Sequence, residues 1–147
     1  MNNITLSPHF KLNEFTKSET ANRLGLKNEP TAEALVNLTA LCHEVLEPLR
    51  RAVKKAIVIN SGYRSEAVNK AVGGVSNSQH MKGEAVDLSA SRGADNTDLL
   101  GIICTFSNYD QPTDYTNAKG QVQFIHASLK RDGKTSRSPD DSCRKKR

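Results

Sequence analysis

The sequence predicts an α+β fold: a single compact domain in which a small antiparallel sheet packs against helices. Leucine and valine recur at three- and four-residue steps over residues 31–51, the pattern of one long amphipathic helix. Short runs rich in β-branched residues follow, separated by helical segments and loops. A chain of 147 residues with 36% hydrophobic content is long enough for one core and short for two, so we expect one domain with tails.

The first elements are expected to be short helical turns over residues 5–29. Asn13 and Ser18 are suited to cap two of these turns, and Gly25 is suited to end the second in a left-handed conformation. The long helix that follows should bend near Pro48, because proline lacks the amide hydrogen that a helix needs.

The second half of the domain is expected to alternate strands with helices. Ser65 should cap a helix, a glycine-rich loop follows, and Asp95 or Asn96 should open the last helix. The expected strands are residues 56–61, 84–89 and 121–129, and the expected helices are residues 65–72 and 96–106. Neither an internal repeat nor an interdomain linker is visible, so the domain should extend over residues 1–129.

The net charge of +5 comes from the C-terminal end. Residues 130–147 contain eight of the 21 Lys and Arg but only three of the 16 Asp and Glu, which leaves 13 of each sign in residues 1–129. Because the domain itself is neutral, a specific nucleic-acid surface is not expected. The basic tail has almost no apolar residue and is expected to be disordered.

The N-terminus lacks the basic start and apolar run of a secretory signal, and no stretch approaches the roughly 18 apolar residues of a membrane span. We therefore expect a chain that is made in the cytoplasm and has no transmembrane segment. Cys42, Cys104 and Cys143 are an odd set at wide spacing, so unpaired thiols without a chemical role are expected.

His80 and Asp87 lie on either side of a glycine in the segment "HMKGEAVDL". Gly83 lets the chain turn from a loop into a strand, and the alternation of the strand then places Ala85 and Asp87 on one face. A carboxylate in a buried strand is costly unless it is hydrogen-bonded, paired or bound to a metal. His80, just before the strand, is the natural neighbour to share a cation with Asp87.

His126 lies in the last expected strand, and an antiparallel pairing would bring it beside Asp87. Two imidazoles and a carboxylate with one open position are the ligand set of a catalytic zinc site. The spacing alone leaves a second interpretation open, in which two hydrogen-bonded histidines and a capped aspartate have only structural roles. His9 and His43 are expected to be structural or surface residues.

Three segments together resemble peptidase family M15, the zinc D-alanyl-D-alanine carboxypeptidases and phage endolysins. They are "INSGYRS" at 59–65, "VGGVSNSQHMKGEAVDL" at 72–88 and "FIHAS" at 124–128. The middle segment matches the family pattern S-x-H-x-x-G-x-A-x-D at each fixed position: Ser78, His80, Gly83, Ala85 and Asp87. The resemblance covers roughly residues 5–129. It implies a Hedgehog/D-Ala-D-Ala peptidase-like fold and Zn²⁺ as cofactor, with three ligands: His80, Asp87 and His126.

The resemblance also implies roles in substrate binding and catalysis. Arg64 would hold a carboxylate or carbonyl oxygen of the substrate and would stabilise an oxyanion. Ser78 and Gln79 would line the pocket, although Ser78 is equally suited to cap a loop. The implied reaction is hydrolysis of an amide bond in the peptide stem of peptidoglycan, assisted by a nearby general base.

The general base is where this sequence departs from the family pattern. Many relatives have an acidic residue three positions before the second histidine ligand, but this chain has Gln123 there, which does not accept a proton usefully at neutral pH. Asp114, or else Asp110, is the candidate substitute from the preceding loop. Both also suit turn positions, and if neither acts as the base, the base lies elsewhere or activity is weak. Glu84 is a poorer candidate, because its strand position faces away from Asp87.

The sequence thus leaves more than one function open. The first is a zinc-dependent peptidoglycan peptidase of carboxypeptidase or endopeptidase type, expected in a phage protein that acts at the cell wall after release or delivery. The second is a wall-binding module that keeps the zinc and the pocket but hydrolyses weakly or not at all. A third is loose nucleic-acid association through the tail. The expected partner is the peptidoglycan stem peptide, and the oligomeric state is not set by the sequence.

Overall fold

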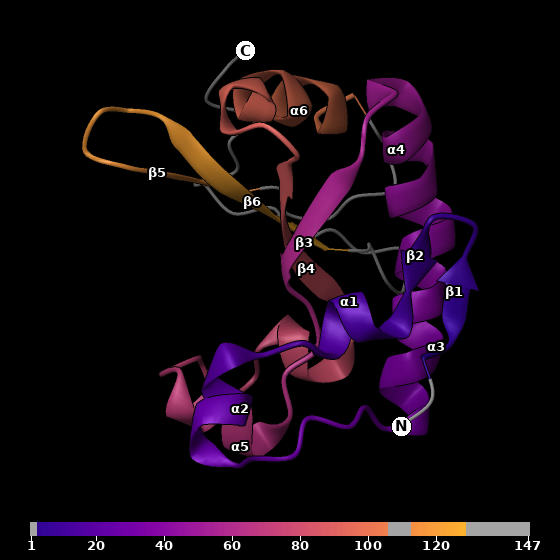
Figure 1. The fold of residues 1–147 in the computed structure, drawn as a ribbon, viewed down its shortest axis with the longest axis vertical. Coiled ribbons are helices and arrows are strands. Elements are labelled where there is room, and N and C mark those ends of the chain that lie inside the picture. Colours follow the sequence, from indigo (N-terminus) through magenta and orange to yellow (C-terminus); the bar gives the residue numbers. More distant parts are fainter. Residues whose placement is uncertain (1–2, 106–112, 129–147) are drawn as a thin grey trace.

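The computed structural model describes residues 3–105 and 113–128, without the side chains of Thr113 and Asp114. Figure 1 shows a central sheet, one long helical run beside it, and a small lobe of helices at one end. The elements are β1 (Thr5–Ser7), β2 (Phe10–Lys11), α1 (Leu12–Thr16), α2 (Glu19–Leu24), α3 (Ala32–Leu41), the π-helix η1 (Cys42–Leu46), α4 (Glu47–Val53), β3 (Ile57–Ser61), α5 (Glu66–Ala71), the 3₁₀-helix η2 (Gln79–Lys82), β4 (Ala85–Ala90), the 3₁₀-helix η3 (Gly93–Asp95), α6 (Asn96–Ile103), β5 (Thr113–Thr116) and β6 (Val122–Ser128). The predicted α+β class is confirmed.

The main sheet is antiparallel and has the strand order β3-β4-β6-β5. Strands β3, β4 and β6 are the three that the sequence predicts, and each of their bounds differs from the prediction by at most one residue. The sequence analysis missed β5, because the four residues "TDYT" show no apolar alternation. This strand forms a hairpin with β6 that projects from the body of the domain (Figure 1).

The N-terminal segment is not made of helical turns alone, as predicted. β1 and β2 pair as a small antiparallel ribbon, and strands of 3 and 2 residues are too short to produce a recognisable sequence pattern. The predicted cap at Asn13 is wrong, because Asn13 lies inside α1 and Lys11 is the N-cap residue. Ser18 and Gly25 cap α2 as predicted, and Gly25 has a φ of 67°.

The predicted long helix changes type in its middle. The π-helical turn η1 joins α3 to α4 and lies directly before Pro48. Proline has no amide hydrogen to donate to the carbonyl one turn earlier, so a regular α-helical ladder cannot continue through this position. The irregularity predicted near Pro48 is therefore a π-helical turn.

Asp95, one of the two predicted caps, is the N-cap residue of α6, but its side chain makes no capping hydrogen bond. The Asn96 side chain is 2% exposed and joins two strands instead. Its Oδ1 accepts a hydrogen bond from the Ala90 amide at 2.7 Å, and its Nδ2 donates to the Val122 carbonyl at 2.8 Å. The Asn96 side chain can bridge Ala90 and Val122 because β4 ends and β6 begins beside the start of α6.

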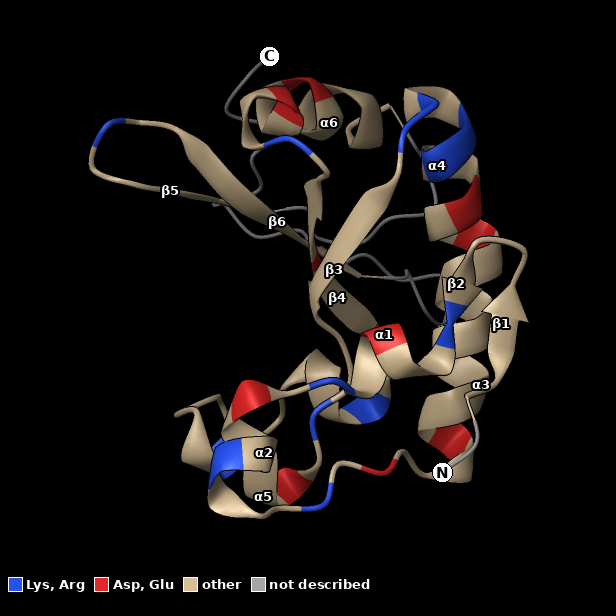
Figure 2. Cartoon of the chain, in the orientation of Figure 1, with Lys and Arg blue, Asp and Glu red and all other residues tan. Residues whose placement is uncertain are grey.

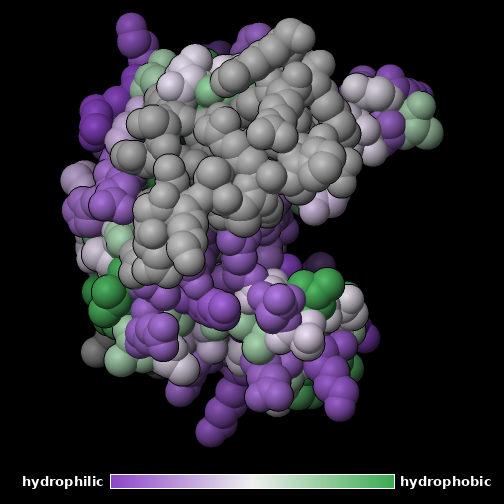
Figure 3. All heavy atoms as spheres, turned by 180° about the vertical axis from the view of Figure 1, so that it is seen from behind, coloured by the Kyte–Doolittle hydropathy of each residue, from purple (hydrophilic) through white to green (hydrophobic). Residues whose placement is uncertain are grey.

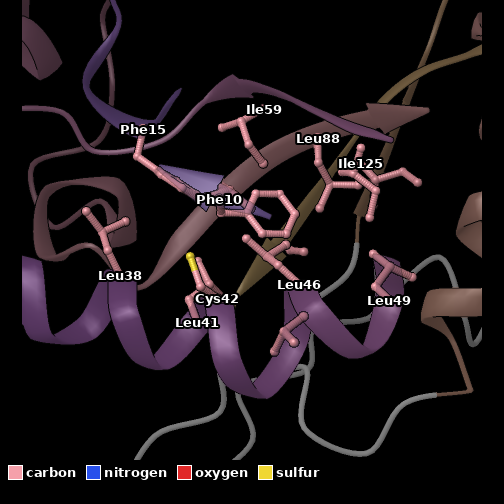
Figure 4. Close-up of a cluster of buried hydrophobic side chains, with 14 of the residues drawn as sticks. Phe10, Phe15, Leu38, Leu41, Cys42, Leu46, Leu49, Ile59, Leu88 and Ile125 are labelled. Atoms are coloured by element: carbon pink, nitrogen blue, oxygen red, sulfur yellow. The ribbon is translucent and has the colours of Figure 1, made fainter. Parts of the chain in front are cut away.

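The hydrophobic core lies between the sheet and the helical run, and Figure 4 shows side chains of the helices pointing toward the strands. The helical run contributes Leu38, Leu41, Cys42, Leu46 and Leu49, the sheet contributes Ile59, Leu88 and Ile125, and the N-terminal segment contributes Phe10 and Phe15. Each fully buried side chain of this size stabilises the fold by about 1.5–3 kcal/mol. One face of the sheet is thus used for packing, which leaves the other for polar chemistry.

Figure 2 shows both basic and acidic residues distributed along the described helices, strands and loops. Among the described residues, no helix is both long and apolar enough to span a membrane. Cys42 is a free, buried cysteine, as expected. Cys104 is disulfide-bonded, so the expectation of an unpaired thiol is wrong there; wide spacing in sequence does not prevent proximity in the fold. The predicted tail at 130–147 lies outside the described residues.

Candidate metal centre and cleft

The predicted metal ligands on the strands lie on the sheet face opposite the long helix. Asp87 of β4 is directly opposite His126 of β6 in the antiparallel register, and cross-strand partners share a face. The alternate residues of both strands point into the core, as the sequence predicts: Val86, Leu88, Ile125 and Ala127. The pairing of β4 with β6 therefore brings together two residues that are 39 positions apart.

His80 reaches the same place from η2, the short helix before β4. The Ser78 hydroxyl oxygen accepts a hydrogen bond from the His80 amide at 3.2 Å and begins this helix, while Gly83 ends it with a φ of 72°. A Cβ atom at Gly83 would lie 2.4 Å from the Ala34 carbonyl oxygen. Only glycine therefore allows the turn to pack this closely against α3, which fixes the path from His80 to Asp87.

The three side chains offer nitrogen and oxygen atoms that all lie within 4.8 Å of one another. His80 Nε2 is 3.5 Å and His126 Nδ1 is 3.0 Å from the same Asp87 oxygen, Oδ1. Ligand atoms bound at zinc distances and tetrahedral angles are about 3.4 Å apart. The spacing between these atoms thus matches that of a metal site before any side chain moves.

Hydrogen bonds outside the cluster direct the histidine nitrogens. His80 Nδ1 is 2.7 Å from the Gly62 carbonyl oxygen, which can only accept, so Nδ1 carries a proton and Nε2, which faces Asp87, is the nitrogen left to bind a metal. His126 Nε2 is 3.3 Å from Gln79 Oε1, and His126 Nδ1 is 3.0 Å from Asp87 Oδ1. With a metal bound, Nε2–H would donate to Gln79 and Nδ1 would bind the ion, so that both rings would present a metal-binding nitrogen to the same point.

Asp87 is ionised in this setting. Burial alone would raise the pKa of its carboxyl group, but hydrogen bonds and positive charge from His126 and His80 lower the pKa well below its ordinary value. Its side chain is 16% exposed, so a charged oxygen is held at the edge of the core. A carboxylate kept ionised between two imidazoles is a strong donor set for a divalent cation.

Arg64 lies beside the metal cluster, in the loop after β3. Its backbone amide donates to the His80 carbonyl oxygen at 3.0 Å, and its side-chain Nη1 donates to Asn69 Oδ1 at 3.2 Å. Burial lowers the pKa of the guanidinium and the charge of Asp87 raises it, so the two charges are close enough to interact. The loop leaves β3 at Gly62, where a Cβ atom would meet the Phe15 backbone at 2.7 Å.

Arg64 and Asp87 line one cavity of about 700 Å³, which extends from the sheet to the lobe of α2 and α5. Its other lining residues are mostly polar: Lys17, Ser18, Glu19, Thr20, Asn22, Asn60, Ser61, Tyr63, Val68 and Val72. Figure 3 shows the molecule hollowed between the projecting β5–β6 hairpin and this lobe. The cavity is large enough for a short peptide segment and opens beside the cluster of metal-binding atoms.

The family model for peptidase M15 matches residues 8–128 of this chain. The chain belongs to the peptidase M15 family. A zinc D-Ala-D-Ala carboxypeptidase of Streptomyces albus G is 50% identical over 46 residues, which are 31% of this chain and 18% of that relative. The match thus covers less than a fifth of the relative's length.

Zinc is the metal that membership of the M15 family implies, and the residues present fit it. Two neutral imidazoles and one carboxylate are a common ligand set of catalytic zinc, with the fourth position left for water or substrate. Hydrogen bonds donated to the Gly62 carbonyl oxygen and to Gln79 Oε1 would select the histidine tautomers that this coordination needs. His80, Asp87 and His126 would hold the ion.

The predicted bases lie in different settings in this M15 chain. Gln123 is exposed, its Nε2 donates to the Gln121 carbonyl oxygen at 3.4 Å, and the register of β5 with β6 shifts at this residue. In β5, Asp114 pairs with Ile125 while Thr113 pairs with His126, and the Asp114 side chain is outside the described part of the chain. Asp110 lies outside the described residues as well. The assignment of Asp114 as a catalytic residue stays a prediction.

Tyr115 is a residue near the site that the sequence analysis missed. It is paired with Phe124 in register, and the two rings stack at 4.5 Å with an angle of 17°. Burial and the charge of Asp87 raise the pKa of the Tyr115 phenol, while the charge of Arg64 lowers it, so the phenol lies near both groups. Because β5 itself was not predicted, no sequence pattern pointed to this side chain.

Proposed function

We propose that this protein is a zinc-dependent peptidase that hydrolyses an amide bond in peptidoglycan stem peptides. The observation that carries the proposal is the convergence of His80, Asp87 and His126 beside an open polar cavity that also contains Arg64. The similarity to a protein named zinc D-Ala-D-Ala carboxypeptidase supports the choice of substrate. Whether the terminal or an internal bond is cut is decided by the products, as described below.

In this proposal the site residues have separate roles in metal binding and substrate binding. His80, Asp87 and His126 hold the ion, and Gln79 keeps the His126 ring in the orientation that ligation needs. Zinc, when bound, would lower the pKa of a coordinated water and polarise the scissile carbonyl. Arg64 would bind a carboxylate or carbonyl oxygen of the substrate. Ser78 and Gln79, which the sequence places in the pocket, are not among the lining residues of the cavity; Ser78 accepts from the His80 amide and Gln79 contacts the His126 ring.

Proton transfer is assigned to Asp114 in this proposal. Gln123 cannot take a proton at neutral pH. A carboxylate has the chemistry that a general base needs, although the register pairs Asp114 with the core residue Ile125 and pairs Thr113 with His126. Asp114→Asn should lower kcat by about 100-fold or more without loss of zinc, as removal of a general base does, and Asp110→Asn tests the alternative in the same assay.

The metal site is tested by measuring the zinc content of the purified full chain. One zinc ion per chain is expected for the wild type, and Asp87→Asn and His126→Ala should lose it. Asp95→Asn is the matched control, because its carboxylate pairs with Lys55 at 3.4 Å, away from the site. Zinc content that stays unchanged in Asp87→Asn would contradict the proposed ligand set.

The reaction is tested by incubating the protein with purified peptidoglycan, with and without a chelator. Release of free D-alanine indicates a carboxypeptidase, whereas new amino groups within the stem peptide indicate an endopeptidase. The exposed Gln123 favours a second candidate function, a wall-binding module that keeps the metal site with weak or no hydrolysis. That function predicts retention on peptidoglycan without product, even with zinc in excess. Action at the cell wall as a phage protein stays a prediction of the sequence resemblance.

A further inference from the structure

Asn69 of α5 holds the Arg64 guanidinium through a side chain whose own orientation is fixed. It is 3% exposed, its Oδ1 accepts from Arg64 Nη1 at 3.2 Å, and its Nδ2 donates to the Val75 carbonyl at 2.8 Å. A carbonyl oxygen can only accept, so the amide group cannot flip without placing oxygen against oxygen. The acceptor that Asn69 offers to Arg64 is therefore set by the loop after α5.

Gly74 holds this pair in place from the other side. Its amide donates to the Asn69 carbonyl oxygen at 2.9 Å. A Cβ atom at Gly74 would lie 2.1 Å from Asn69 Oδ1 and 2.9 Å from Arg64 Nη1. The loop backbone thus covers the hydrogen bond between Asn69 and Arg64 so closely that no side chain fits at Gly74.

The hydrogen bond from Nη1 determines which edge of the guanidinium stays free. Nη1 is the terminal nitrogen on the side of Cδ, so the opposite edge carries the parallel donors Nε–H and Nη2–H, the pair that binds a carboxylate with two hydrogen bonds. Arg64 Nε is buried and has no hydrogen-bond partner among the described residues. A buried donor without a partner is costly, and an oxygen atom of a ligand would satisfy it.

We propose that Asn69, supported by Gly74, is a positioning residue that turns the Nε–Nη2 edge of Arg64 toward a carboxylate of the substrate. This inference rests on the proposed function, because it takes Arg64 as the group that binds the substrate. It adds a cause for the orientation of Arg64: the acceptor oxygen of Asn69 and the absence of a side chain at residue 74. Asn69 itself does not touch the substrate in this arrangement.

The experiment measures binding of a probe carboxylate, N-acetyl-D-alanine, to the zinc-loaded full chain. Binding is followed by nuclear magnetic resonance on the methyl signals of the probe, which can be measured with every variant. The Arg64 Nε–Hε signal, which Arg64→Lys identifies by its loss, reports the contact at the guanidinium. Asn69→Leu removes the acceptor and should weaken binding about tenfold, the loss expected for one hydrogen bond to a charged group. Gly74→Ala should cause a similar loss, because its methyl group displaces Asn69 Oδ1.

Two variants serve as controls for these effects. Asn69→Asp keeps an acceptor for Arg64 but replaces the donor to the Val75 carbonyl by an oxygen, so it should bind the probe less tightly than the wild type and more tightly than Asn69→Leu. Gly73→Ala introduces the same methyl group one residue earlier, at a φ of 74° and with nothing within 4 Å. Alanine at this position strains the loop backbone but meets no neighbouring atom. Arg64 should therefore stay in place, and binding of the probe should stay within about threefold of the wild type.

The results separate this inference from the proposed function. Loss of binding in Arg64→Ala, without loss in Asn69→Leu and Gly74→Ala, would overturn the inference alone. Unchanged binding in Arg64→Ala would overturn the role of Arg64 and the inference with it. An equal loss in Asn69→Asp and Asn69→Leu would also contradict the role of the acceptor. If Asn69→Leu does not fold, the comparison of Gly74→Ala with Gly73→Ala decides.

Discussion

Replacing Gly83 by alanine tests whether the turn between His80 and Asp87 needs close contact with α3. Gly83 has a φ of 72°, and an added Cβ atom would lie 2.4 Å from the Ala34 carbonyl oxygen. Ordinary van der Waals contacts begin near 3.4 Å, so backbone must move by about 1 Å. The left-handed conformation costs about 1–2 kcal/mol for a residue with a side chain, and overpacking adds about 1–3 kcal/mol.

Gly25→Ala is the matched comparison, because Gly25 has a φ of 67° and nothing within 4 Å of an added Cβ atom. It should lose only the conformational part, about 1–2 kcal/mol of the free energy of unfolding. Gly83→Ala should lose about 2–5 kcal/mol. Urea unfolding of both variants and the wild type gives these values directly. Losses that agree within about 0.5 kcal/mol, the usual range for surface changes, would refute the close contact with Ala34.

Three further predictions concern groups whose chemistry the fold changes. Burial raises the pKa of the Cys42 thiol to about 12, so iodoacetamide should leave this cysteine unmodified in the folded protein and modify it once urea unfolds the chain; mass spectrometry of peptides distinguishes the two. The Glu47 carboxyl group has a lowered pKa, because hydrogen bonds from Ser7 and His9 outweigh the opposite effect of burial. The stabilisation that ionised Glu47 provides is therefore present at neutral pH and is lost as pH falls below about 4.3, where an unfolded glutamate takes up its proton. The urea midpoints of the wild type and Glu47→Gln should therefore converge in acid. A difference that stays constant with pH would contradict the lowered pKa of Glu47. Gln79→Leu removes the acceptor at His126 and should weaken zinc binding about 10- to 100-fold in a chelator competition, whereas Gln79→Glu should retain it.

The sequence predicts the metal cluster well because the information is local. Gly83 and the alternation of β4 assign Asp87 to the polar face, and the register with β6 then places His126 opposite, as expected. His80 is expected just before the strand, and it lies there, in η2. Each of these relations spans only a few residues or one strand pairing.

The contacts that orient the site are not local, and for this reason the sequence does not show them. The Gly62 carbonyl that directs His80 and the Asn69 amide that directs Arg64 depend on how a loop crosses another segment. β5 has too few residues and too little alternation to be recognised, so Tyr115 was missed with it. Asparagine favours the N-cap position, which is why the sequence predicts a cap at Asn13. In the structure α1 starts at Leu12, directly after the β1–β2 ribbon, so Lys11 takes that position.

The direct opposition of Asp87 and His126 across β4 and β6 also makes the site sensitive to errors in strand pairing. A slip of one residue would move one of the two side chains to the opposite face of the sheet, because successive residues of a strand alternate. A misaligned pair of strands would then bury a charged or polar group in the core, and the chain would lose its affinity for the ion. Metal uptake would therefore distinguish correctly assembled chains from misfolded ones, and newly made protein could be sorted on a chelating resin before any activity is measured.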